Sequence, residues 1–204
     1  MALLFALTLI ACESAPIATQ QPGDTAVPDA TGLSAAEASD LLFLREEEKL
    51  ARDLYLAFYE AWGTQPFTNV SSSEQTHMDN VLLVLEAYDL EDPVGDNGEG
   101  VFSDASIQAI YDQLLADGLV SEIAALDAAA YVEEIDLLDL TTLLASTSNA
   151  DIVALGETLS CGSRNHLRGF TSQLASRGVE YTPEVLDPDV YAEIVGSDHE
   201  GCSE

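Results

Sequence analysis

Four long stretches of the chain repeat apolar residues every three or four positions, which is the spacing of one face of an α-helix. The first is predicted over residues 34–62, because SAAE places Ser34 and Glu37 three residues apart, as in a capping box. The second is predicted over residues 71–90, and the third is predicted to start near Ser121.

The fourth long helix is predicted to start at SNAD, with Ser148 as its cap and Asp151 three residues later. Between the second and third helices, an acidic stretch with Pro and Gly interrupts helicity. It leads into a short helix, ASIQAIYDQLLADG, capped by Ser103 or Asp104. No alternating strand pattern competes with these helices. The pattern therefore predicts an all-α fold, with a four-helix bundle over residues 34–178 and a short extra helix in its crossover.

Acidic and imidazole side chains interrupt the apolar face of each long helix. Burying such groups without partners costs several kcal/mol each, so something must neutralise them. One or two metal ions would do so, and carboxylate oxygens with imidazole nitrogens suit iron or manganese. The alternative is a buried network in which the glutamates form ion pairs with Arg45, Arg52, Arg164 or Arg168. The candidate metal ligands are Glu48, Glu74 with His77, Glu133 or the adjacent Glu134, and His166.

The net charge is strongly negative, −31, with only six Lys and Arg in the chain. Such a chain would repel phosphates, which excludes nucleic acid as a partner. The charge suits a salty or cation-rich exterior, where it is screened. It also raises a further alternative, a surface protein that buffers cations weakly and does not need His77 or His166.

The N-terminal sequence MALLFALTLIAC holds a short apolar run, which cannot span a bilayer and is typical of a signal peptide. Its end, LIAC, resembles a bacterial lipobox, in which the signal is cut before a cysteine that then receives lipid. We expect residues 1–11 to be a signal peptide and Cys12 to be lipidated; an ordinary signal peptide with an incidental cysteine is the alternative. Residues 12–33, rich in Pro, Thr, Ala and Gly, are expected to be a flexible tether. This predicts an exported protein anchored to a membrane, in the periplasm or at the cell surface.

Two further cysteines, Cys161 and Cys202, remain if Cys12 carries lipid. An exported compartment permits a disulfide between them, which would tie the acidic tail, residues 179–204, to the last long helix. Two free thiols are the alternative.

Four sequence blocks resemble a known family. EKLARDLY, residues 48–55, matches the Glu-x-x-Ala-x-x-x-Tyr pattern on the first helix of rubrerythrin-type, ferritin-like proteins, and EQTH, residues 74–77, matches their second-helix Glu-x-x-His. With VEEIDLLDL and GSRNHLRGF, these blocks are similar to the ferritin-like family named domain of unknown function 2202, over about residues 38–178. The resemblance implies that Glu48 is the first-helix ligand, Glu74 a bridging carboxylate, His77 a terminal ligand and His166 the fourth-helix histidine. Glu133 or Glu134 takes the third-helix place, and the apolar pattern favours Glu133.

The sequence departs from the rubrerythrin pattern at one position. A full site repeats Glu-x-x-His on the fourth helix, whereas SRNH places Ser163 where that Glu would be. The site is then one carboxylate short unless Glu134 or Asp136 substitutes.

The resemblance implies a redox function at an iron or manganese site, either ferrous oxidation or peroxide reduction. The chain has no rubredoxin-like set of four cysteines, so a di-iron oxidoreductase of this kind would take electrons from a partner protein. Ferritin-like bundles often pair, so the resemblance allows a homodimer, although no interface signal stands out in the sequence. The alternative function is a metal-free, non-catalytic helical module of the cell envelope.

Overall fold

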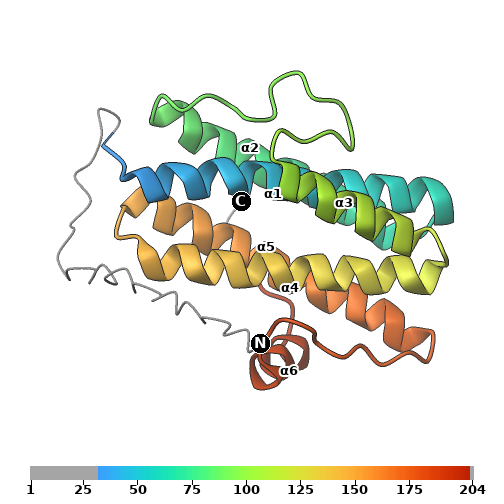
Figure 1. The fold of residues 1–204 in the computed structure, drawn as a ribbon. Coiled ribbons are helices and arrows are strands. Elements are labelled where there is room, and N and C mark those ends of the chain that lie inside the picture. Colours follow the sequence, from blue (N-terminus) through green and yellow to red (C-terminus); the bar gives the residue numbers. More distant parts are fainter. Residues whose placement is uncertain (1–31, 203–204) are drawn as a thin grey trace, which may run out of the picture.

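The computed structural model describes residues 32–202, and within this range the chain forms helices and no strand. The predicted all-α class is confirmed. Four long helices lie side by side, and two shorter ones pack on their outside (Figure 1). The elements are α1 (Ala35–Trp62), α2 (Gln65–Ala87), α3 (Ala105–Gly118), α4 (Glu122–Ser146), α5 (Ala150–Ser176) and α6 (Pro188–Gly196).

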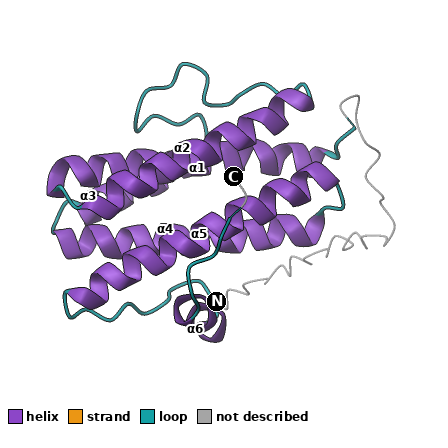
Figure 2. Cartoon of the chain, turned by 180° about the vertical axis from the view of Figure 1, so that it is seen from behind, coloured by secondary structure: helices purple, strands orange, loops and turns teal. Residues whose placement is uncertain are grey.

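The long helices form two antiparallel hairpins, α1 with α2 and α4 with α5, which pack against each other. Helix α1 contacts α4 and α2 contacts α5, so the four helices enclose a common interior. Helix α3 belongs to the connection between the hairpins and packs on α1 and α4. Helix α6 packs on α5 and is seen end-on in Figure 2, where the long helices run across the view.

The interior holds two separate apolar clusters. One gathers around Phe58, Phe67 and Phe170, and the other around Leu41, Val81 and other aliphatic residues. On α1, α2 and α5, polar residues fall where one cluster ends and the other begins. The apolar clusters therefore enclose a polar layer between them.

Most helix starts lie where the sequence predicts them. Ser34 and Glu37 form the capping box of α1, with Ser34 Oγ accepting from Glu37 N at 3.2 Å and Glu37 Oε2 accepting from Ser34 N at 2.8 Å. Gly63 ends α1 in the left-handed conformation, with φ of 68°, which costs glycine little. Asp104 caps α3 and Ser121 caps α4.

Two predicted helix starts are wrong. Helix α2 begins at Gln65 rather than near residue 71, because Pro66 occupies its first turn, where a missing N–H group costs nothing. Helix α5 is capped by Asn149 rather than Ser148, since the Asn149 side chain accepts from the backbone N–H of Asp151 and Ile152.

The charged run of α1 holds the connection that follows α2. Arg45 donates to both carboxylate oxygens of Asp92, at 3.1 and 3.0 Å. Glu46 accepts from the backbone N–H groups of Ser103 and Asp104, at 2.5 and 2.8 Å. Charge-assisted bonds of this kind are stronger than neutral ones, so they fix this acidic loop against the helix.

A buried ion pair one turn further along α1 holds the middle of the same loop. Lys49 donates to Asp53 at 2.5 Å and to the carbonyl oxygen of Gly98 at 2.8 Å. Asp53 also accepts from the backbone N–H of Gly100 at 2.9 Å, and from Arg52. Much of the REEEKLARD run is thus used to hold the loop.

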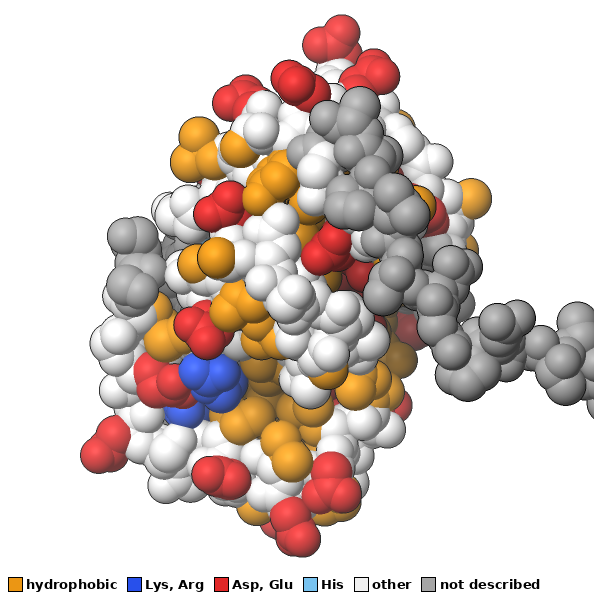
Figure 3. Space-filling model, turned by 90° about the vertical axis from the view of Figure 1, so that its left-hand side faces the viewer, with side chains coloured by type: hydrophobic (Ala, Val, Ile, Leu, Met, Phe, Trp, Pro, Cys, Tyr) orange, Lys and Arg blue, Asp and Glu red, His pale blue; other side chains and the backbone are white. Residues whose placement is uncertain are grey.

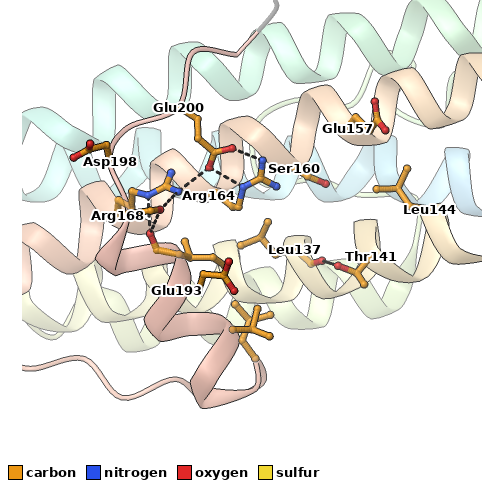
Figure 4. A pocket seen from close by; sticks show the side chains of 14 residues that line it. Leu137, Thr141, Leu144, Glu157, Ser160, Arg164, Arg168, Glu193, Asp198 and Glu200 are labelled. Carbon is orange, nitrogen blue, oxygen red and sulfur yellow. Dashed lines mark hydrogen bonds and ion pairs between the residues drawn. The ribbon is translucent and has the colours of Figure 1, made fainter.

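The tail after α5 is tied back to that helix. Cys161 and Cys202 form a disulfide bond with an S–S distance of 2.12 Å. Arg164 and Arg168 both donate to the Glu200 carboxylate, at 2.5 to 2.8 Å (Figure 4). The last described residues therefore lie against the middle of α5.

The predicted signal peptide, tether and lipidated Cys12 lie outside the described residues, so they stay predictions. Among the helices of residues 32–202, none is long and apolar enough to cross a bilayer. Acidic side chains are scattered over the face drawn in Figure 3, where the few basic side chains gather beside acidic ones.

Candidate metal centre

Side chains from all four long helices meet in the polar layer. They are nearly inaccessible to solvent, with exposed fractions between 1% and 8%. They are the residues that interrupt the predicted apolar faces, namely Glu48 of α1, Glu74 and His77 of α2, Glu133 of α4 and His166 of α5.

The cluster consists of two triads that share Glu74, each with ligand atoms within 4.8 Å of one another. In the first, His77 Nδ1 lies 3.2 Å from Glu48 Oε2 and 2.8 Å from Glu74 Oε2. In the second, His166 Nδ1 lies 2.8 Å from Glu74 Oε1 and 3.4 Å from Glu133 Oε2. The two oxygens of Glu74 thus face different triads, which is the geometry of a bridging carboxylate.

The charges in the cluster are strongly coupled. Burial alone would lower the pKa of His77, but the carboxylates of Glu48 and Glu74 raise it well above its ordinary value. Against the same effect of burial, Glu74 and Glu133 raise the pKa of His166 to about 10. Burial raises the pKa of Glu48 to about 7 and that of Glu133 to about 6. Without a bound cation, burial and mutual repulsion therefore disfavour the charged forms of Glu48 and Glu133.

No lysine or arginine forms an ion pair with these carboxylates. All six lie within the described residues, and each forms an ion pair elsewhere, so the predicted arginine network around the central glutamates is not what the structure contains. The pairs are Arg45–Asp92, Lys49–Asp53, Arg52–Asp53, Arg164–Glu200, Arg168–Glu200 and Arg177–Glu122.

Several facing atoms of the cluster are close without being hydrogen-bonded. His166 Nδ1 and Glu74 Oε1 lie 2.8 Å apart, yet each is buried without a hydrogen-bond partner. Glu48 Oε1 is also buried and unpartnered. Buried polar atoms normally find a partner, so the arrangement fits atoms that converge on a shared cation.

Surrounding side chains orient the ligands. Tyr55 donates its hydroxyl hydrogen to Glu133 Oε1 at 2.5 Å. Ser73 Oγ lies 3.0 Å from His166 Nε2, which leaves the opposite ring nitrogen facing the glutamates. Such outer contacts set ring orientation and ligand basicity at metal sites. The sequence interpretation did not include Ser73, because helix spacing does not indicate what the far side of a ring touches.

Gly162 of α5 makes room for one of the histidines. A Cβ atom at this position would lie 2.4 Å from His77 Nε2, closer than real contacts allow. The sequence interpretation missed this residue as well. The only available signal was a glycine inside a helix that also carries a candidate ligand, His166.

Glu134, the alternative to Glu133 in the sequence interpretation, lies outside the cluster. Its carboxylate accepts from the backbone N–H groups of Glu184, Val185 and Leu186, at 2.8 to 3.3 Å. Neighbouring positions on a helix point in directions about 100° apart, so Glu133 faces the interior while Glu134 faces the tail.

Asp136 is the substitute carboxylate that does lie beside the cluster. It is 6% exposed, and burial with the charges of Glu48 and Glu133 raises its pKa well above the ordinary value. Ser163, at the position of the missing Glu, forms a hydrogen bond to Asp136 Oδ2. Asp136 Oδ1 is buried and has no partner. An Asp–Ser pair thus occupies the side of the centre where the fourth-helix carboxylate is missing.

A hollow of about 460 Å³ reaches the histidines from outside. His77 and His166 form its floor, and tail residues His199 and Glu200 form part of its wall. A larger hollow of about 780 Å³ between α4, α5 and α6 lies away from the cluster. In its wall, Arg164 and Arg168 both bind the Glu200 carboxylate (Figure 4). The hollow of about 460 Å³ therefore brings the outside of the molecule close to the two histidines of the candidate metal centre.

Fold and site together define an all-helical protein with a buried carboxylate–histidine cluster. The chain belongs to the family described as uncharacterized protein domain (DUF2202), whose model matches residues 37–198. It is 43% identical over 168 residues to the uncharacterized protein MJ0754 of Methanocaldococcus jannaschii, covering 82% of this chain and 91% of that protein. It is also similar to the crystal structure of the hypothetical protein MJ0754 from Methanococcus jannaschii, with a TM-score of 0.81, 40% identity, and coverage of 89% of this chain and 100% of that one.

Proposed function

We propose that the protein is an exported, ferritin-like four-helix bundle that binds two iron or manganese ions in its interior. The observation that carries the proposal is the convergence of buried carboxylates and histidines with no lysine or arginine among them. The two antiparallel hairpins, joined by a long connection, support the ferritin-like arrangement.

The donor set fits the proposed metals. Each triad offers two carboxylate groups and one imidazole nitrogen, and Glu74 belongs to both. Oxygen-rich sites with imidazole suit iron and manganese, whereas thiolate-rich sites select softer or tetrahedral ions. Glu48 and His77 would hold one ion, Glu133 and His166 the other, with Glu74 between them. Three protein residues per ion leave further coordination positions for a small molecule.

The bound ions would supply one-electron redox chemistry towards dioxygen or peroxide. The residues of this chain would position that chemistry: Tyr55 holds Glu133 by a hydrogen bond, and Ser73 fixes the ring of His166. The hollow over His77 and His166 admits a small molecule, and the apolar clusters above and below exclude bulk water. Electrons would come from a partner protein.

The Cys161–Cys202 disulfide supports the proposed export, because disulfides persist in oxidising compartments and are rare in reducing ones. Anchoring through Cys12 belongs to the same proposal. Fractionation of cells that express the natural chain or its Cys12→Ala variant tests it. We expect the natural chain with the membranes and the variant released into the soluble exported fraction; equal distribution would contradict lipidation.

The metal proposal is tested by counting metal ions in protein purified anaerobically with iron supplied. We expect about two ions per chain, one for each triad, and loss of both in Glu74→Ala because that residue is shared. Glu86→Ala, an exposed carboxylate on the same helix, is the matched control and should keep both ions. Less than one ion per natural chain, or equal content in Glu74→Ala, would instead favour the metal-free structural module.

A further inference from the structure

Glu47 is buried on a different side of α1 from its neighbour Glu48. It is 6% exposed, and its Oε2 atom is buried with no hydrogen-bond partner. It lines a hollow of about 310 Å³ between α1 and α4, together with Asp40 and Asp139. Asp40 is exposed and Asp139 half-buried, so this hollow joins the surface to a buried carboxylate.

The charged groups that face Glu47 are all acidic. Asp40 and Asp139 line the same hollow, and Asp136 lies about one helical turn before Asp139 on α4. The six Lys and Arg are all paired elsewhere, and His77 and His166 face the other glutamates.

Asp136 continues this series of carboxylates inward. Its charge acts on Glu47, and it lies near enough to Glu48 and Glu133 for their charges to act on it. Its Oδ1 atom is buried without a partner, as is Glu47 Oε2. Carboxylates therefore follow one another from the surface hollow, through Glu47 and Asp136, to ligands of both triads.

The opening on the histidine side has a different character. Most of its wall consists of uncharged side chains such as Ser73, Thr76 and Asn165. Its one carboxylate, Glu200, is bound by Arg164 and Arg168. The opening beside Glu47 thus holds three carboxylates without a Lys or Arg partner, against one paired carboxylate on the histidine side, and such a cluster favours the approach of a cation.

We propose that Glu47, Asp139 and Asp40 form an uptake site for divalent cations, from which an ion passes by way of Asp136 to the metal centre. The proposal rests on the function proposed above, since it presumes a centre to fill. It gives separate roles to two faces of the molecule, with ions entering between α1 and α4 and small molecules reaching the histidines between α2 and α5.

The test is the rate of metal loading, measured by stopped-flow absorbance with the metal-free full chain and Co²⁺ as the probe. Glu47→Gln and Asp139→Asn each remove one negative charge with little change of shape. We expect loading to slow by roughly tenfold or more, as for loss of electrostatic focusing, with about two ions per chain still bound at the end. Asp139→Asn alters a half-buried side chain, so it keeps the test valid if Glu47→Gln folds poorly.

Glu157→Gln is the matched control, because it removes one charge from an exposed position on α5. It should load at the natural rate. Natural loading rates in both Glu47→Gln and Asp139→Asn would overturn the uptake site. Loss of an ion at equilibrium in these variants would also overturn it, because it would show that Glu47 or Asp139 is a ligand of the metal centre. Failure of the natural chain to bind Co²⁺ would reject the metal centre itself and the uptake site with it.

Discussion

Glu74 shows how one side chain can join two halves of a site. Its oxygens face His77 on its own helix and His166 across the interior. Burial alone would raise its pKa, but the two flanking histidines hold the pKa of Glu74 well below its ordinary value. Its carboxylate therefore stays ionised more readily than those of Glu48 and Glu133, which suits the bridging position proposed for it.

Gly162 leads to a prediction about packing around the centre. Gly162→Ala places a methyl group against the His77 ring, so we expect a loss of about 1–3 kcal/mol in stability, as for overpacking, and weaker metal binding. Gly169→Ala on the same helix has nothing within 4 Å of its new Cβ. It should stabilise the protein by up to about 1 kcal/mol, because alanine favours helix over glycine. Thermal unfolding and metal titration measure both; equal effects would contradict the fit around His77.

The residues of the buried cluster could be predicted from the sequence, and their surroundings could not. Apolar periodicity placed Glu48, Glu74, His77 and His166 on inward faces, and it favoured Glu133 over Glu134. Periodicity states which face a residue occupies but not which atom of a neighbouring helix it meets. The roles of Ser73 and Gly162 depend on such contacts, whereas Asp136 was already a candidate for the missing carboxylate.

Helix faces explain why adjacent residues serve different purposes. In α1, Glu46 binds the connecting loop, Glu47 lines the hollow towards α4, and Glu48 faces the centre. In α4, Glu133 faces the centre and Glu134 holds the tail. Adjacent acidic residues in one run therefore face different parts of the molecule, because successive positions on a helix point in different directions.

This division predicts opposite outcomes for two neighbouring substitutions in α4. Glu134→Ala removes the charged acceptor of three backbone N–H groups, so we expect a loss of about 1–3 kcal/mol, as for hydrogen bonds to a charged group, and faster proteolysis after residue 178, with metal content unchanged. Glu133→Ala should lose an ion and keep the tail protected. Metal analysis and limited proteolysis separate the two. Loss of metal in Glu134→Ala would contradict the assignment.

The helices themselves were largely predictable, and the misplaced starts have local causes. The residues from Gln65 to Val70 look like a loop in the sequence because of Pro66, which is in fact suited to a first helical turn. At α5 two adjacent capping residues compete, and Asn149 rather than Ser148 reaches the free N–H groups. The anchoring of the connecting loop by α1 depends on long-range contacts that no local pattern reveals.

At the scale of the whole molecule, the disulfide closes a long loop. Cys161 and Cys202 are 41 positions apart, so chain-entropy arguments assign the bond about 4 kcal/mol of stability. We expect thermal unfolding at a clearly lower temperature after reduction, and the same shift in a Cys161→Ser, Cys202→Ser double variant. The double variant also serves as the control, because added reductant should not shift it further. An unchanged unfolding temperature would show that other contacts, such as those of Glu200, hold the tail without it.

The charge distribution of the whole molecule points to a role for cations. The chain carries a net charge of −31, and its six basic residues are all paired with carboxylates outside the centre. Lysine and arginine therefore do not neutralise the interior carboxylates, which leaves His77, His166 and, on the function proposed above, bound divalent ions. A ligand that binds the folded state alone stabilises it by mass action, so metal loading should raise the unfolding temperature and a chelator should reverse the rise.

Anomalous diffraction from crystals of the manganese-loaded protein tests the central claim most directly. The account predicts two interior peaks on either side of Glu74, one beside Glu48 and His77 and the other beside Glu133 and His166. An interior without a peak, in which these side chains are paired with one another or turned towards solvent, would contradict it.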